Sequence, residues 1–266
     1  MKSKVIYGNY TLAEKELDDC SVDLFFCDPP YFTTNHEWDK QWKSISEYVA
    51  WTEKWLQLAY DKLNDTGSIY VCIGWEHSGY IQQVLEKIGF HIKNRITWKR
   101  DKGRGSKTNW KNMHEDIWFA TKHKTNYTFN VDDVMIEKEI IAPYRDKDGN
   151  PKGWFETKDG RKIRYTHPGN LWTEFTVPFW SMHEVRSYAK TKRTPNNTCI
   201  KHPTQKPKGL VKKCILASSN KNDTVVDFFA GSGTTGIASK ELNRNFILFD
   251  NKEEYIQMIQ ERLKNE

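Results

Sequence analysis

Asp28, Pro29, Pro30 and Tyr31 follow directly on the apolar segment 22–27, a combination that suits chemistry on an amino group. Neither proline carries an N–H group, so the backbone here presents carbonyl acceptors in a stiff conformation. The Asp28 carboxylate and the Pro29 carbonyl can hold both hydrogens of an –NH₂ group, and Tyr31 offers a flat face to a planar base. Such a clamp would point the nitrogen at an electrophile and stabilise the charge that develops on it. The alternative is an ordinary Pro-Pro turn with an exposed acid and tyrosine.

A second apolar segment, 224–229, leads into a glycine-rich turn at 231–236. Glycines let the backbone approach a ligand closely, and the helix N-terminus beyond the turn offers free N–H groups. Asp250 closes the next predicted strand about 20 residues after Gly231, where an acid binds ribose hydroxyls in dinucleotide-binding folds. The turn lacks the Gly-Lys-Ser/Thr ending of a P-loop, which argues against an NTPase. The pattern favours a nucleoside-type cofactor over glycines that serve packing alone.

Three motifs resemble those of the DNA amino-methyltransferases that use S-adenosylmethionine. DPPY (28–31) resembles their catalytic motif, DFFAGSGTT (227–235) their cofactor motif, and HPTQKP (202–207) the segment that closes over the methionine end of the cofactor. The order of the motifs is similar to that of the permuted β group, and MHEDIWFATK (113–122) resembles a family strand. The chain departs from the family at Phe228, where Pro is usual, and at Asn9, where many members have Asp.

The resemblance implies site-specific transfer of a methyl group from S-adenosylmethionine to the N6 amino group of an adenine flipped out of double-stranded DNA. Cytosine N4 methylation, RNA adenine N6 methylation, and DNA binding by an inactive methyltransferase fold are the alternatives. The catalytic residues would then be Asp28, Pro29, Pro30 and Tyr31. The residues implied in cofactor binding are Asn9, Tyr10, His202, Thr204, Gln205, Lys206, Asp227, Phe229, Gly231, Ser232, Gly233, Thr234, Thr235 and Asp250.

A sheet must bring these distant motifs together. Strands are predicted at 5–7, 23–27, 68–74, 91–98, 115–121, 224–229 and 245–250. The capping box of Ser44 and Glu47 predicts the start of a helix, which NDTG (64–67) stops. Further helices are predicted from 77 to 88, through 210–215, ending at 242, and starting at 253. The alternation predicts an α/β fold with a doubly wound, mostly parallel Rossmann-like methyltransferase sheet, in which 91–98 and 115–121 form a hairpin-like end. DPPY and the glycine-rich turn should then face one crevice at the carboxyl edge of the sheet.

Charge is distributed unevenly along the chain. Between Lys99 and Lys213 there are 25 Lys/Arg against 13 Asp/Glu, whereas the remainder is acidic. We therefore predict a catalytic half at 1–125, a basic target-recognition insertion at 126–200 and a cofactor-binding half at 201–266. Lys102, Arg104 and Lys107 lie in a glycine-containing loop that can contact phosphates or remain solvated.

Composition narrows the class of protein further. Five cysteines without a C-x-x-C pair, and histidines without ligand spacing, predict a reducing compartment and no metal. No apolar run approaches the roughly 20 residues of a membrane span, and the first residues lack a secretory signal, so we expect no membrane partner. The expected location is the cytoplasm, for a bacterial or phage-encoded protein. The expected partner is double-stranded DNA, while a cognate restriction endonuclease and a homodimer are compatible additions.

Overall fold

The computed structural model describes residues 3–34, 36–100, 107–141, 144–175 and 204–265. The described residues within 1–129 and 170–266 form one compact unit, and those within 130–169 form a second. The predicted phosphate contacts Lys102 and Arg104 lie outside the described residues.

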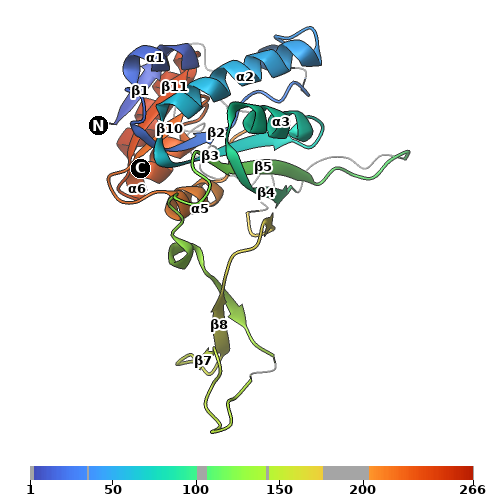
Figure 1. Ribbon diagram of the computed structural model, residues 1–266, viewed down its shortest axis with the longest axis vertical. Coiled ribbons are helices and arrows are strands. Elements are labelled where there is room, and N and C mark those ends of the chain that lie inside the picture. The colour runs from blue at the N-terminus through green and yellow to red at the C-terminus, as the bar shows by residue number, and fades with distance from the viewer. Residues whose placement is uncertain (1–2, 35, 101–106, 142–143, 176–203, 266) are drawn as a thin grey trace. The chain divides into compact units, whose positions relative to one another are not determined.

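An eight-stranded sheet in the order β1-β11-β10-β2-β3-β5-β4-β9 is the frame of the first unit (Figure 1). The strands from β1 to β3 in this order are all parallel, whereas β5 is antiparallel to both β3 and β4. The predicted α/β class, the mostly parallel sheet and its hairpin end are therefore confirmed. The strands are β1 (Lys4–Tyr7), β2 (Val22–Cys27), β3 (Leu63–Gly74), β4 (His91–Lys99), β5 (His114–Thr121), β9 (Leu171–Trp172), β10 (Thr224–Asp227) and β11 (Asn245–Asp250).

Helices follow the strands in alternation, as predicted. They are α1 (Ala13–Glu16), α2 (Ile45–Lys62), α3 (Ser78–Ile88), α5 (Lys208–Ser218), α6 (Thr234–Glu241) and α7 (Glu253–Asn265), with short 3-10 helices at Tyr10–Leu12 and Glu37–Asp39. The Ser44 hydroxyl caps α2 by accepting from the Glu47 N–H at 3.2 Å. Gly89 ends α3 in the left-handed conformation, which a residue without Cβ adopts at no steric cost.

Alternate residues of β2 belong to two hydrophobic cores, one on each face of the sheet. Phe25 packs in a cluster with Trp55 of α2 and Ile81 of α3. Leu24 and Phe26 pack in a second cluster with α5, which Figure 1 shows on the opposite side of the sheet from α2 and α3. Because both faces of β2 are covered, a ligand can reach this strand only at its carboxyl end, at the edge of the sheet.

Two predicted boundaries were wrong. NDTG at 64–67 is part of β3, which begins at Leu63 directly after α2. Gly67 serves close packing there, since a Cβ would come within 2.6 Å of the Leu63 side chain and 3.0 Å of the Asp23 carbonyl. The strand predicted to reach Phe229 ends at Asp227, because the Asp227 carboxylate turns the backbone by accepting the Phe229 N–H at 2.9 Å.

The second unit contains a three-stranded antiparallel sheet of β6 (Ile136–Glu139), β8 (Lys162–Thr166) and β7 (Phe155–Glu156), preceded by a 3-10 helix at Val131–Val134. Val134, Trp154 and Ile163 are its buried apolar residues. Residues 170–175, within the predicted insertion of 126–200, belong to the first unit, where β9 pairs with β4. Because 176–200 lie outside the described residues, the boundary at 200 stays a prediction. Within the described part of the chain, the helices are too short or too polar to cross a membrane.

Candidate active site

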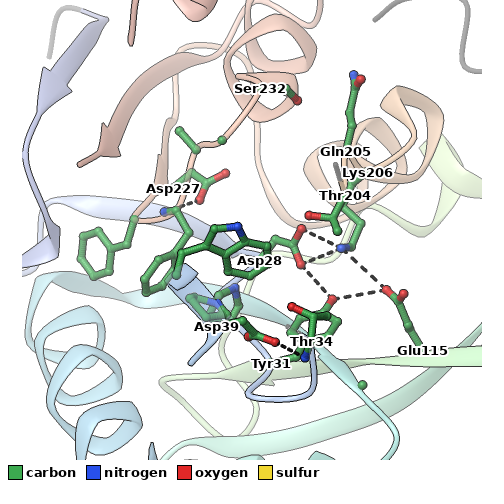
Figure 2. A pocket seen from close by; sticks show the side chains of 18 of the residues that line it. Asp28, Tyr31, Thr34, Asp39, Glu115, Thr204, Gln205, Lys206, Asp227 and Ser232 are labelled. Carbon is green, nitrogen blue, oxygen red and sulfur yellow. Dashed lines mark hydrogen bonds and ion pairs between the residues drawn. The ribbon is translucent and has the colours of Figure 1, made fainter. Parts of the chain in front are cut away.

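The carboxyl ends of the parallel strands form the candidate site. Asp28 follows β2, while Asp227, Asp250 and Gly74 end β10, β11 and β3. These strands lie side by side and run the same way, so their ends meet at one edge. All four residues line a cavity of about 570 Å³. Figure 2 shows Asp28 and Asp227 among the residues that line it. The expectation that DPPY and the glycine turn face one crevice is met.

The antiparallel hairpin β4–β5 brings two more charges to this edge. Because β5 runs opposite to β3, its first residues lie beside the last residues of β3, and Glu115 pairs in register with Gly74. Arg100 follows the end of β4, the other strand of the hairpin. An ion pair of 2.7 Å joins Arg100 to Glu115, and both residues line the cavity.

Asp28 is at the centre of a polar cluster with Tyr31, Lys206 and Glu115 (Figure 2). The Lys206 ammonium lies 2.6 Å from each oxygen of the Asp28 carboxylate and 3.6 Å from Glu115 Oε2. The Tyr31 hydroxyl donates to Asp28 Oδ1 at 2.8 Å, and its oxygen is 3.3 Å from Glu115 Oε2. The carboxylate predicted to hold a substrate amino group is therefore hydrogen-bonded to a lysine ammonium.

Backbone contacts fix the shape of the DPPY segment. The Tyr48 hydroxyl donates to the Pro30 carbonyl at 3.0 Å, and His77 Nδ1 lies 2.8 Å from the Tyr31 carbonyl oxygen. The next residue, Phe32, has a left-handed backbone with φ of 57°, which is strained for a side chain of this size. Its ring stacks on Tyr48 and on His77 with centroid distances of 5.7 and 5.9 Å. The packing of this ring compensates for the backbone conformation.

Two carboxylates shape the glycine-rich turn. Asp227 accepts from the Phe229 N–H at 2.9 Å and from the Thr235 hydroxyl at 2.6 Å. Asp250 accepts from the Gly231 N–H at 2.8 Å, which ties the turn to the end of β11. Gly233 has φ of 80°, and a Cβ there would lie 2.8 Å from Ile259, so this position requires glycine.

Burial sets the protonation of the site. It raises the pKa of Asp227 to about 7, with hydrogen bonds from Thr235 and Phe229 opposing that rise. Burial, together with the charges of Asp28 and Glu115, raises the pKa of Tyr31 well above its ordinary value, so its hydroxyl stays protonated and donates. Burial alone would lower the pKa of Lys206, but the charges of Asp28 and Glu115 outweigh it and the pKa is raised. Lys206 is therefore an ammonium at neutral pH.

One buried polar atom beside the cavity has an unfilled acceptor position within the described part of the chain. The Gln205 amide donates to the Thr234 hydroxyl at 3.1 Å, but its Oε1 is buried without a hydrogen-bond partner in the described residues. Buried acceptors are normally paired, so a donor is expected from a bound molecule. The α-ammonium of a methionine moiety would supply one. The predicted cofactor residues thus fit S-adenosylmethionine.

The remaining predicted residues are distributed around the same cavity. The lining includes Asn9, Tyr10, Pro29, Pro30, Thr204, Phe229, Ser232 and Thr235. The Asn9 carboxamide accepts from the Thr11 N–H at 3.0 Å, and the Tyr10 ring packs against Phe228 and Phe229 at 6.3 and 6.5 Å. His202 lies outside the described residues. The described residues also hold no group of three or more His, Cys, Asp or Glu side chains arranged to bind a metal.

Sequence reasoning missed Arg100, Glu115 and Asp39. The signal for the first two was the predicted hairpin: the exit of one strand and the entrance of the next must meet the carboxyl ends of the parallel strands. Asp39 carried no such signal, because it sits in a short 3-10 helix outside every motif. It is fully buried and lines the cavity, accepting from the backbone N–H groups of residues 32–34 at 2.5–2.8 Å.

Solved structures share this fold. The PvuII DNA methyltransferase, which is cytosine-N4-specific, superimposes with a TM-score of 0.67 at 19% identity, covering 98% of this chain and 86% of that one. TTHA0409, a putative DNA modification methylase from Thermus thermophilus solved with S-adenosyl-L-methionine, gives 0.64 at 17% identity, covering 99% and 93%.

Sequence comparisons establish the family. Type II methyltransferase M.HpaI of Haemophilus parainfluenzae is 32% identical over 268 residues, which is 100% of this chain and 76% of the relative. DNA adenine methyltransferase YhdJ of Escherichia coli K12 is 33% identical over 266 residues, or 97% and 82%. The model of the N6/N4 methyltransferase family, described as DNA methylase, matches residues 22–261. This match spans most of the chain and both halves of the site, and the chain therefore belongs to the N6/N4 DNA methylase family.

Proposed function

We propose that this enzyme methylates the N6 amino group of adenine at a specific site in double-stranded DNA, with S-adenosylmethionine as cofactor. Relatives at 32–34% identity are named as Type II methyltransferases, and one at 33% is named as a DNA adenine methyltransferase. The observation that carries the proposal is that one cavity holds both the DPPY motif and the glycine-rich turn. A methyl donor seated on the turn and an amino group held at DPPY would therefore meet.

Asp28 and the Pro29 carbonyl are the acceptors that orient the target amino group. The lone pair of an exocyclic amino nitrogen is delocalised into the ring, so holding both N–H bonds favours a pyramidal, nucleophilic nitrogen. The same acceptors stabilise the positive charge that develops on that nitrogen as the methyl group arrives. Tyr31 lies beside this position and stacks on the base. Since these groups lie at the edge of a buried sheet, the base must leave the DNA helix to reach them.

Residues of the turn and of the segment before α5 hold the cofactor. S-adenosylmethionine supplies the methyl group when it is bound. Gln205 Oε1 would accept from its α-ammonium, Asp250 would bind its ribose hydroxyls, and Thr234 and Gly231 would line the methionine end. Asp227 keeps the turn in shape through its two hydrogen bonds. The ring of Tyr10, which packs beside Phe229, would cover the adenine ring of the cofactor.

Recognition of the DNA sequence would belong to the basic middle of the chain. The unit of 130–169 carries an antiparallel sheet with basic side chains such as Lys162 and Arg164 along β8. Relatives named as Type II methyltransferases support a role in restriction-modification. A cognate endonuclease as partner and a bacterial cytoplasmic location are further proposals. Self-association as a homodimer is a further proposal that sedimentation analysis would test.

The decisive test is base-resolution modification sequencing of DNA from a methylation-free bacterial host that expresses the chain. Asp28→Ala and the surface variant Glu53→Ala are expressed beside it. We expect N6-methyladenine within one short sequence motif, its loss with Asp28→Ala, and its retention with Glu53→Ala. N4-methylcytosine in its place would reassign the base. Unmodified DNA from a protein that still binds S-adenosylmethionine would overturn DNA as the substrate and make RNA the next one to test.

A further inference from the structure

The Lys206 ammonium is hydrogen-bonded to Asp28, the carboxylate to which the proposed function assigns the target amino group. Dashed lines in Figure 2 join it to both oxygens of the carboxylate, each at 2.6 Å. Only 6% of the residue is exposed. A lysine ammonium and an exocyclic amino group are both nitrogens that donate N–H bonds to a carboxylate. The ammonium bridges both oxygens of Asp28, so an amino group that approaches the carboxylate from the same side has to displace it. Lys206 and the base therefore compete for Asp28.

A second acceptor for the ammonium lies close by. Glu115 Oε2 is 3.6 Å from Lys206 Nζ, so a small movement of the flexible four-carbon stem changes an ion pair with Asp28 into one with Glu115. Arg100 holds the other oxygen of Glu115 at 2.7 Å and keeps that carboxylate in place. The Tyr31 hydroxyl, within reach of both carboxylates, can follow the change.

We propose that Lys206 is a displaceable placeholder for the target amino group. Without substrate its ammonium compensates the part-buried charge of Asp28; when the base enters, the ammonium moves to Glu115 and frees Asp28. This inference rests on the proposed function, because it takes Asp28 as the acceptor of the amino group. Lys206 then weakens the preference of the site for an amino group, because that group has to displace the ammonium from Asp28, whereas a base without one leaves the ammonium in place.

The energetic reason for such a placeholder is the cost of an unpaired charge away from water. Removing one partner of a buried ion pair is strongly destabilising, since the other charge loses both water and its counterion. With two carboxylates and one movable ammonium, the cluster keeps an ion pair before and after the base enters. The stronger the Lys206–Asp28 pair, the less the site favours a base that carries an amino group over one that lacks it.

The test measures discrimination between adenine and purine, which lacks the amino group, at the target position of a DNA duplex. The duplex carries the motif found by modification sequencing, and S-adenosylhomocysteine is present so that no transfer occurs. Fluorescence anisotropy gives the ratio of Kd for the purine duplex to Kd for the adenine duplex. It is measured for the wild type, Lys206→Met, Lys206→Arg and the control Lys208→Met, which removes an ion pair with Glu241 outside the cavity.

The placeholder predicts that Lys206→Met raises this ratio about tenfold, because the amino group no longer has to displace a charge-assisted hydrogen bond. Lys206→Arg lowers the ratio, since a guanidinium holds a carboxylate with two bonds and does not yield to the base. Glu115→Gln also lowers it in the wild type but changes it less than twofold in the Lys206→Met background, where no ammonium needs a second acceptor.

The inference is overturned if the Kd ratio is lower in Lys206→Met than in Lys206→Arg. If Lys206 only holds Asp28 in place, Lys206→Arg leaves the Kd ratio unchanged and Lys206→Met lowers it. Failure of the proposed function gives a different result: the ratio then stays the same in Asp28→Ala as in the wild type, whatever residue stands at 206. Thermal unfolding of each variant confirms that the compared proteins are folded.

Discussion

The Asp39 carboxylate accepts a hydrogen bond from the Phe32 backbone N–H at 2.6 Å, and this contact fixes the exit of the DPPY segment. Its second oxygen accepts from Thr33 and Thr34. We expect Asp39→Ala to lower the free energy of unfolding by about 2 kcal/mol, because backbone donors lose their acceptor. We also expect kcat/KM for DNA to fall at least tenfold while the Kd of S-adenosylmethionine changes less than twofold. Urea unfolding, methyl transfer and calorimetric titration measure these effects.

Glu37→Ala is the matched control, since Glu37 is an exposed acid of the same short helix. Asp39→Asn keeps one acceptor oxygen and should lie between the wild type and Asp39→Ala. Equal stability of Asp39→Ala and Glu37→Ala would show that the segment is held by other contacts, such as the aromatic packing of Phe32.

The parts of the site that obey strand topology were predictable from the sequence. Asp28, Asp227 and Asp250 each follow or end an apolar strand, and parallel pairing alone brings those ends to one edge. The Lys206–Asp28 pair was not predictable, because its partners are 178 residues apart and nothing in their local sequences specifies a contact. The same holds for Asp39, whose importance comes from burial and from a backbone conformation that no periodicity reports. The sheet of the second unit was also missed, because its short strands alternate charged and apolar residues irregularly.

Gln205 should contribute directly to cofactor affinity. Its Oε1 is buried without a partner in the described residues, so a donor from S-adenosylmethionine would form a hydrogen bond at no cost in lost protein contacts. We expect Gln205→Leu to weaken S-adenosylmethionine binding about tenfold in calorimetric titration, the factor that one hydrogen bond to a charged group supplies. Gln82→Leu, which replaces a surface glutamine paired with Glu86, should leave the affinity unchanged. An affinity of Gln205→Leu within twofold of the wild type would place the ammonium elsewhere.

Phe228 explains how this chain departs from the usual motif of its family. Its buried ring packs against Phe25, Phe249 and Tyr10 at centroid distances of 4.9, 5.6 and 6.3 Å. Replacement by the family's usual residue, Phe228→Pro, should lower the free energy of unfolding by about 3 kcal/mol, since a large cavity forms among these rings. Phe228→Leu fills more of the space and should cost about 1 kcal/mol. Urea unfolding compares the three proteins, and a Phe228→Pro variant as stable as the wild type would mean that the rings close the cavity by moving together.

The buried carboxyl of Asp227 should make stability depend on pH. Its pKa in the folded protein is about 7, above its ordinary value of 3.8, so the folded state retains a proton that the unfolded state has lost between these values. The free energy of unfolding therefore falls as pH rises through this window, and the loss is complete above the folded pKa. Between pH 5 and pH 8 we expect this residue to contribute a decrease of about 3 kcal/mol.

Asp227→Asn removes the titration while keeping an acceptor for the Phe229 N–H. At pH 5 we expect the variant to be less stable than the wild type, whose protonated carboxyl fits the site at least as well as the amide does. At pH 8 the difference in free energy of unfolding should be smaller, because the wild type has lost stability and the variant has not. Urea unfolding of both proteins at the two pH values gives the four free energies required. A difference between wild type and variant that is the same at pH 5 and pH 8 would show that Asp227 is ionised throughout, with the Thr235 and Phe229 hydrogen bonds outweighing its burial.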